Sequence, residues 1–240
     1  MFAGSAALAP NEGLAEVYRL ATGVLLLFVL ISGRKGVLAV GRWLAPFITA
    51  FLLLLALGRI GRRPELALQN GQGPWQGVEA ALLYASYNLG FSVAVLTGTA
   101  GLLKKKSQRL TLAVLANLLL GGVILLLFWA LHTLPPGQLG EPVPLLAIAA
   151  LGGPAIAVCY RFVLWASMFT TALANAFALT GRLAESGKLS WARGALVVVV
   201  LSVVGSYLGF ASLIRVAYPL LGLAVLWFLI YLAWRRWHHG

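Results

Sequence analysis

The sequence predicts an all-α polytopic membrane protein with about seven transmembrane helices. Of its 240 residues, 61% are apolar and only 10% are charged, whereas soluble domains are about half apolar and a quarter charged. The apolar residues are grouped in long blocks, and a helix needs about 20 such residues to cross a bilayer. The lipid bilayer is therefore the predicted environment of the chain.

Six apolar blocks each predict one crossing. They are Leu14–Ile31, Trp43–Leu57, Val78–Leu103, Leu110–His132, Ala192–Ile214 and Val216–Trp234. A seventh stretch, Val143–Gly181, is too long for one crossing and too short for two crossings and a turn. Gly152-Gly153-Pro154 interrupts it, and proline is common at the first position of a helix. We therefore expect a short surface helix over Val143–Leu151 and then one crossing over Pro154–Thr180.

The basic residues predict an orientation. Lys and Arg number 18 against six acidic residues, a net charge of +12. They lie mostly in short gaps between apolar blocks, so lipid head groups rather than nucleic acid are the predicted partners. With seven crossings most of them fall on one side, which should be the cytoplasmic one, and this predicts a multi-pass protein with its N-terminus outside and its C-terminus inside. The cluster Arg59, Arg62 and Arg63 opposes this assignment.

Several kinds of catalytic site are excluded by composition. The chain contains no Asp and a single cysteine, Cys159, which excludes aspartyl dyads, Ser-His-Asp triads and cysteine-cluster metal sites. The H-E-x-x-H, G-x-S-x-G and P-loop motifs are also absent. We therefore expect a protein that is not an enzyme and has no cofactor.

A first polar cluster lies within the block Val78–Leu103, over Tyr84-Ala-Ser-Tyr-Asn-Leu-Gly-Phe-Ser92. Glycine weakens a helix, and Asn and Ser side chains compete for its backbone groups. One interpretation is a helix that is broken near the membrane midplane, as in secondary transporters that expose backbone groups to a substrate. The other is that small and hydroxyl residues allow close helix packing, and both stay open here.

A second polar cluster lies in the predicted crossing that begins at Pro154. Ser167, Thr170, Thr171 and Asn175 recur at intervals that place them on one helix face. Such a row of oxygens could supply part of a Na⁺ site. The alternative is that these hydroxyls bond to carbonyls of their own helix.

Arg161 is the one basic residue expected inside the membrane. Its guanidinium could extend toward the interface or pair with Glu79 or Glu141, which are assigned to the same outer side. Glu79, at the mouth of the third predicted crossing, could alternatively take part in proton coupling.

Four segments, in order along the chain, carry a resemblance to a known family. They are Met1-Phe-Ala-Gly-Ser-Ala, Tyr84-Ala-Ser-Tyr-Asn-Leu-Gly90, Phe169-Thr-Thr-Ala172 and Tyr218-Pro-Leu-Leu-Gly222. Together they resemble the YkvI family of bacterial membrane proteins, which is similar to the amino acid–polyamine–organocation transporters of the LeuT fold. That fold implies two inverted repeats of five helices, each with its first helix broken at the substrate site.

The resemblance implies a role for both polar clusters. Val78–Leu103 resembles the sixth helix of the fold, and its unwound segment would line the substrate site. The residues expected there are Ser86, Tyr87, Asn88 and Gly90. Pro154–Thr180 resembles the eighth helix, where Thr170 and Thr171 match the hydroxyl pair that ligates Na⁺ in sodium-coupled members.

The resemblance also implies a division of the chain. Residues 1–77 would be a remnant of the first repeat, with the end of helix 3 and helices 4 and 5. Residues 78–240 would be a complete second repeat, including the outer helix at 143–151. The first two helices of the fold would be absent from this chain. The expected function is cation-coupled transport of small, amino-acid-like solutes that bear an amine or an acid, with Na⁺ as a possible coupling ion. The alternative is a non-transporting membrane module that packs with a partner subunit.

Overall fold

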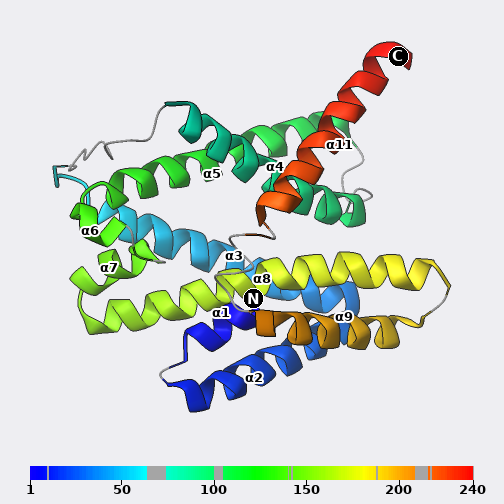
Figure 1. Ribbon diagram of the computed structural model, residues 1–240, viewed down its shortest axis with the longest axis horizontal. Helices are drawn as coiled ribbons and strands as arrows, with labels where there is room; N and C mark the ends of the chain where they lie inside the picture. The colour runs from blue at the N-terminus through cyan, green and yellow to red at the C-terminus, as the bar shows by residue number, and fades with distance from the viewer. Residues whose placement is uncertain are drawn as a thin grey trace. The chain divides into compact units, whose positions relative to one another are not determined.

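The computed structural model is helical wherever it describes regular structure (Figure 1). It describes residues 1–9, 11–63, 74–99, 105–139, 141, 143–187, 189–208, 216 and 218–239. The helices are α1 Phe2–Ala7, α2 Glu12–Ile31, α3 Gly33–Leu57, α4 Pro74–Thr99, α5 Lys106–Leu131, α6 Pro136–Leu139, α7 Pro144–Leu151, α8 Pro154–Glu185, α9 Trp191–Gly205, the 3-10 turn η2 Ser206–Leu208 and α11 Tyr218–His239. The predicted all-α class is confirmed for these residues.

Six helical segments among the described residues are long and apolar enough to cross a membrane. They are Gly13–Ile31, Gly33–Leu57, Lys106–Leu131, Pro154–Glu185, Trp191–Leu208 and Tyr218–Arg235. Their length and composition support a multi-pass membrane protein in a lipid bilayer. Helix α4, which is 26 residues long, is not among the six, so a total of seven crossings stays a prediction. The bacterial membrane and the orientation of the termini stay predictions as well.

The stretch with the internal proline folds as predicted. A short helix, α7, ends at Leu151, and α8 begins at Pro154. Gly153 between them has a φ of +100°, a backbone conformation that glycine adopts readily because it lacks a Cβ atom. Helix α8 continues to Glu185, past the predicted end at Thr180.

The second predicted crossing begins earlier than expected. Arg34, Lys35 and Arg42 lie in the gap between the apolar blocks that end at Ile31 and begin at Trp43, but α3 begins at Gly33 and includes all three. Gly33 has a φ of +66°, a backbone conformation that glycine adopts readily and that interrupts the helix between α2 and α3. Lys and Arg are good helix formers, and their long side chains can reach the interface from within a helix.

The chain divides into two compact units. Unit 1 contains Met1–Ile31, Gln69–Ala100 and Leu173–Gly240, and unit 2 contains Ser32–Leu68 and Gly101–Ala172. Each unit draws on both sides of the predicted repeat boundary between residues 77 and 78. Because a compact unit and a structural repeat are different properties, the division into repeats stays a prediction.

In unit 1, α2 packs against α1 and α9. A Cβ atom on Gly23 of α2 would lie 3.2 Å from a methyl group of Val203 of α9, so the glycine allows the two helices to approach closely. Near the end of α2, the Trp191 indole donates a hydrogen bond to the Leu30 carbonyl at 2.9 Å. The last carbonyls of a helix have no partner within it, so this bond satisfies one of them and joins the end of α2 to the start of α9.

Replacing Trp191 with phenylalanine is expected to lower the free energy of unfolding by about 1 kcal/mol, the usual net value of one hydrogen bond. Phenylalanine keeps a six-membered aromatic ring but lacks the five-membered ring of the indole and its N–H donor. Thermal unfolding in detergent, followed by circular dichroism, measures the change. Trp227, which is 70% exposed on α11, gives the matched control as Trp227→Phe. Equal losses of stability in Trp191→Phe and Trp227→Phe would mean that the hydrogen bond to the Leu30 carbonyl does not stabilise the protein.

In unit 2, α3 packs against α5, and α7 packs against α5. A buried cluster of Ala56, Ala130, Leu134 and Ile148 joins these three helices. Earlier in α3, the ring of Phe51 stacks near that of Tyr160 of α8, with 6.5 Å between centroids. These contacts place the end of α3 beside the junction between α7 and α8.

Candidate functional site

Helix α4 is continuous through the segment that was expected to be unwound. It runs from Pro74 to Thr99 without a break, so the predicted break at Ser86–Gly90 is wrong. The polar side chains donate instead to carbonyls four residues earlier, in the bonds Ser86 Oγ to Leu82 O at 2.7 Å, Asn88 Nδ2 to Tyr84 O at 2.8 Å and Ser92 Oγ to Asn88 O at 2.9 Å. A helix accommodates such bonds with its own hydrogen bonds in place, which explains why these residues do not interrupt it.

Two of the four segments that carry the family resemblance pack on each other. Helix α4 contacts α11 more extensively than any other pair of described helices in the chain (Figure 1). The ring of Tyr87 lies 5.1 Å from that of Tyr218 at an interplanar angle of 89°, and 5.3 Å from that of Tyr84. These edge-to-face contacts are favourable for aromatic rings. We call Tyr84, Tyr87 and Tyr218 the tyrosine cluster.

Two glycines allow the close approach of α4 and α11. A Cβ atom on Gly222 would lie 3.0 Å from the Leu83 carbonyl oxygen, and one on Gly90 would lie 2.6 Å from a methyl group of Val225. Of the two interpretations of the polar cluster, close packing is therefore the one that fits Gly90. The other residues expected at the substrate site differ in exposure, since Ser86 is buried and Asn88 is exposed.

The hydroxyl pair of α8 lies in unit 2. Thr170 and Thr171 both donate to the Ser167 carbonyl, at 3.0 and 2.9 Å, and the Ser167 hydroxyl donates to the Leu164 carbonyl at 3.1 Å. The structure thus contains the bonds within the helix that the sequence left as an alternative. A hydroxyl that donates its proton keeps two lone pairs, so a role as Na⁺ ligands stays a prediction. Among the described residues, no group of three or more His, Cys, Asp or Glu could hold a metal ion.

Arg161 and Glu79 are both exposed. The ion pair found among the described residues joins Arg19 to Glu16 within α2, and the Tyr207 hydroxyl donates to the same Glu16 carboxylate at 2.9 Å. The exposure of Arg161 fits a side chain that extends toward the interface.

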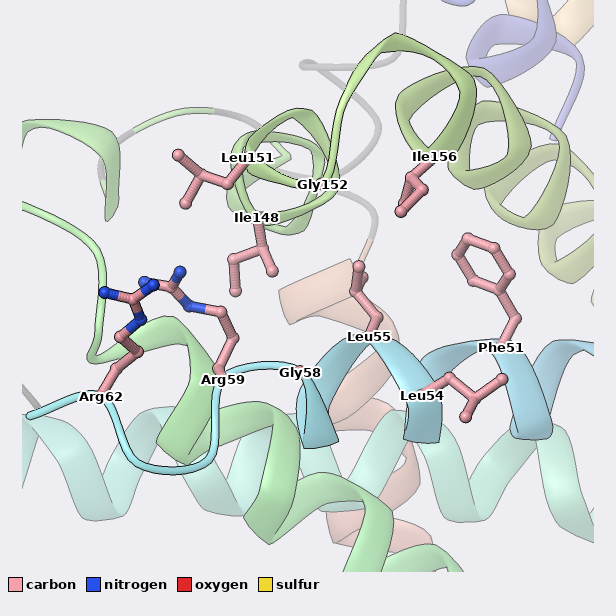
Figure 2. Close-up of a pocket in the computed structure, with 10 residues that line it drawn as sticks. All are labelled: Phe51, Leu54, Leu55, Gly58, Arg59, Arg62, Ile148, Leu151, Gly152 and Ile156. Carbon is pink, nitrogen blue, oxygen red and sulfur yellow. The ribbon is translucent and has the colours of Figure 1, made fainter.

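The structure adds a pocket that the sequence analysis missed, at the end of α3 in unit 2 (Figure 2). It has a volume of about 390 Å³ and is called the α3 pocket below. It is lined by Phe51, Leu54, Leu55, Gly58, Arg59, Arg62, Ile148, Leu151, Gly152 and Ile156. The sequence feature that could have indicated this pocket is the basic cluster at Arg59–Arg63, whose positive charges lie on the side opposite to most other basic residues in the predicted orientation.

The α3 pocket is apolar at one end and basic at the other. Figure 2 shows Arg59 and Arg62 at one end of the pocket and Phe51 at the opposite end. Arg59 is held by Thr133, which accepts hydrogen bonds from Arg59 Nε at its hydroxyl (2.7 Å) and from Arg59 Nη2 at its carbonyl (3.1 Å). One of the two positive charges therefore has a fixed position.

No protein-family model, curated protein or solved structure matches the chain. The resemblance to the YkvI family therefore stays a prediction from four segments of the sequence. What the chain does has to be inferred from its own residues and their contacts.

Proposed function

We propose that the chain is a membrane protein of the YkvI type that transports small solutes bearing an amine or an acid, coupled to a cation. The observation that supports this most is the contact between α4 and α11. The segments around Tyr87 and Tyr218, far apart in the sequence and both part of the family resemblance, lie against each other. Polar groups within membrane-length helices are costly and commonly mark solute pathways.

The continuous form of α4 changes how the solute would be recognised. The backbone carbonyls of a continuous helix are already hydrogen-bonded within it, so side chains must supply the contacts. The faces of the tyrosine cluster can attract an ammonium group, and the amide of Asn88, which is exposed, can accept or donate a hydrogen bond. Ser86 is buried and its hydroxyl bonds to Leu82, so its part would be to shape α4.

The coupling ion in this proposal is Na⁺, bound in part by Thr170 and Thr171. Both hydroxyl protons point to one carbonyl, that of Ser167. Hydroxyl oxygens are hard ligands of the kind that suit cations such as Na⁺. The remaining ligands would come from other parts of the assembled protein.

Replacing Thr171 with valine is expected to abolish Na⁺-dependent uptake, because valine keeps the shape of the side chain and removes its oxygen. Uptake of a panel of ¹⁴C-labelled amino acids into proteoliposomes, with and without a Na⁺ gradient, measures this. Thr49 gives a matched control, since its hydroxyl also bonds to a carbonyl of its own helix, that of Ala45, at 2.9 Å. Thr49→Val should keep Na⁺ dependence, and unchanged dependence in Thr171→Val would rule out the ion site.

A second candidate function is a non-transporting module that packs with a partner subunit. It is favoured by the low burial of α3, α5 and α11, since only 6% of the most apolar window of each is buried, against 28% for α2, α8 and α9. In a membrane, the exposed faces of these three helices must contact lipid or another protein. Absence of uptake for every amino acid, together with cross-linking of Thr171→Cys to another chain in a Cys159→Ser background, would favour this function over transport.

A further inference from the structure

We propose that the α3 pocket binds an anionic phospholipid, with the phosphate at Arg59 and Arg62 and part of one acyl chain along the apolar wall. This inference does not depend on the proposed transport function, because it concerns a different part of the chain. It is carried by three observations, namely the fixed guanidinium of Arg59, the two like charges that line one end of the pocket and the direction of the apolar wall.

The first observation is that Arg59 is positioned in advance. Its partner Thr133 is only 8% exposed, and the Thr133 hydroxyl itself donates to the Ala130 carbonyl at 2.6 Å. The two bonds to Thr133 use two of the five N–H groups of the guanidinium. The others can donate to an anion without first giving up the contact that holds the side chain.

The second observation is that two positive charges line the basic end of the pocket. Arg59 and Arg62 both lie at the same end of the pocket in Figure 2, and none of the described residues that line it carries a carboxylate. Like charges repel each other, and an anion bound at this end of the pocket would balance the two positive charges. A phosphate group suits this place because its oxygens accept paired hydrogen bonds from guanidinium groups.

The third observation is the direction of the apolar wall. From Phe51 to Gly58 the axis of α3 advances about 10 Å, and Arg59 follows Gly58, the residue that caps the end of this membrane-length helix. The wall thus extends from the end of the helix, where head groups lie, into the depth of the hydrocarbon layer. A small soluble anion would leave the wall beside Leu54, Leu55 and Ile156 uncovered, whereas an acyl chain would cover it.

The size of the pocket agrees with a partly enclosed lipid. Its volume of about 390 Å³ is in the usual range of ligand sites, about 300–1,000 Å³. That space holds a phosphate and the first part of a chain, while the rest of the lipid would stay in the bilayer. Basic pockets between transmembrane helices bind anionic head groups in this manner.

The test is a lipid titration of the purified full chain, with bound lipid counted by native mass spectrometry. The probes are dioleoyl phosphatidylglycerol, dioleoyl phosphatidylcholine and inorganic phosphate. We expect one phosphatidylglycerol to bind more tightly than phosphatidylcholine, and Arg62→Gln to weaken it about fivefold. Arg63→Gln removes the same charge from a neighbour that does not line the pocket, and should leave the affinity unchanged.

Three results would overturn the proposal. Equal binding of the two lipids would exclude recognition of the anionic head group. Equal losses of phosphatidylglycerol affinity in Arg62→Gln and Arg63→Gln would mean that the lipid is attracted to the basic surface in general and not bound in the α3 pocket. Displacement of the lipid by inorganic phosphate at equal concentration would assign the site to a free anion. Arg62 is exposed, so its variant should fold even if Arg59→Gln, which breaks the bonds to Thr133, does not.

Discussion

Replacing Gly222 with leucine is expected to separate α11 from α4 and to abolish recovery of a monodisperse protein. A Cβ atom at this position would lie 3.0 Å from the Leu83 carbonyl oxygen, with a Leu83 methyl group 3.5 Å away. The first of these atoms belongs to the backbone of a helix, so it cannot rotate aside as a side chain would. Even Gly222→Ala should cost about 1–3 kcal/mol, the usual range for overpacking.

Size-exclusion chromatography and thermal unfolding in detergent measure the effect of Gly222→Leu. Gly121 offers a matched control, because it lies within α5 and a Cβ atom there would meet nothing within 4 Å. Gly121→Leu should therefore be recovered in normal yield. If both variants behaved alike, the close approach of α4 and α11 would be wrong, and with it the contact on which the transport proposal depends.

Replacing Leu134 with alanine is expected to lower the free energy of unfolding by about 2–5 kcal/mol. Leu134 is completely buried and packs in the cluster with Ala56, Ala130 and Ile148. The lipid environment does not remove this cost. Helices in a membrane associate largely through van der Waals packing, and the atoms that line a void lose those contacts.

The loss in Leu134→Ala can be measured by chemical or thermal unfolding in detergent. Leu120 on α5 is 56% exposed, so Leu120→Ala removes the same atoms from a surface that faces outward. That control should change the stability by a few tenths of a kcal/mol, as surface substitutions usually do. A similar loss at both positions would mean that α3, α5 and α7 do not share the buried cluster.

Much of the fold could be predicted from the sequence because it depends on local signals. The short helix before Gly153 and the start of α8 at Pro154 follow from the preference of proline for the first turn of a helix. The start of α3 at Gly33 could not be predicted in the same way. There the apolar block and the helix differ in length, because Lys and Arg can lie in a helix and still reach water.

The candidate site was predicted less well, for a physical reason that α4 illustrates. Ser86 and Asn88 can either interrupt a helix or bond to its carbonyls, and the sequence is the same in both cases. The structure contains the second arrangement. Gly90 likewise suits either an unwound substrate site or a close contact between helices. The nearby methyl group of Val225 on α11 favours the close contact, because a Cβ atom on Gly90 would collide with it.

By itself the sequence determined that this is a helical membrane protein, because apolar content and block length are sums over many residues and depend little on how the helices meet. Only the tertiary structure decided which residues face one another. Tyr87 contacts Tyr218 and Arg59 is held by Thr133 because segments far apart in the chain pack together. A single sequence carries no direct record of such pairs, so the tyrosine cluster and the α3 pocket became visible only when the helices were placed.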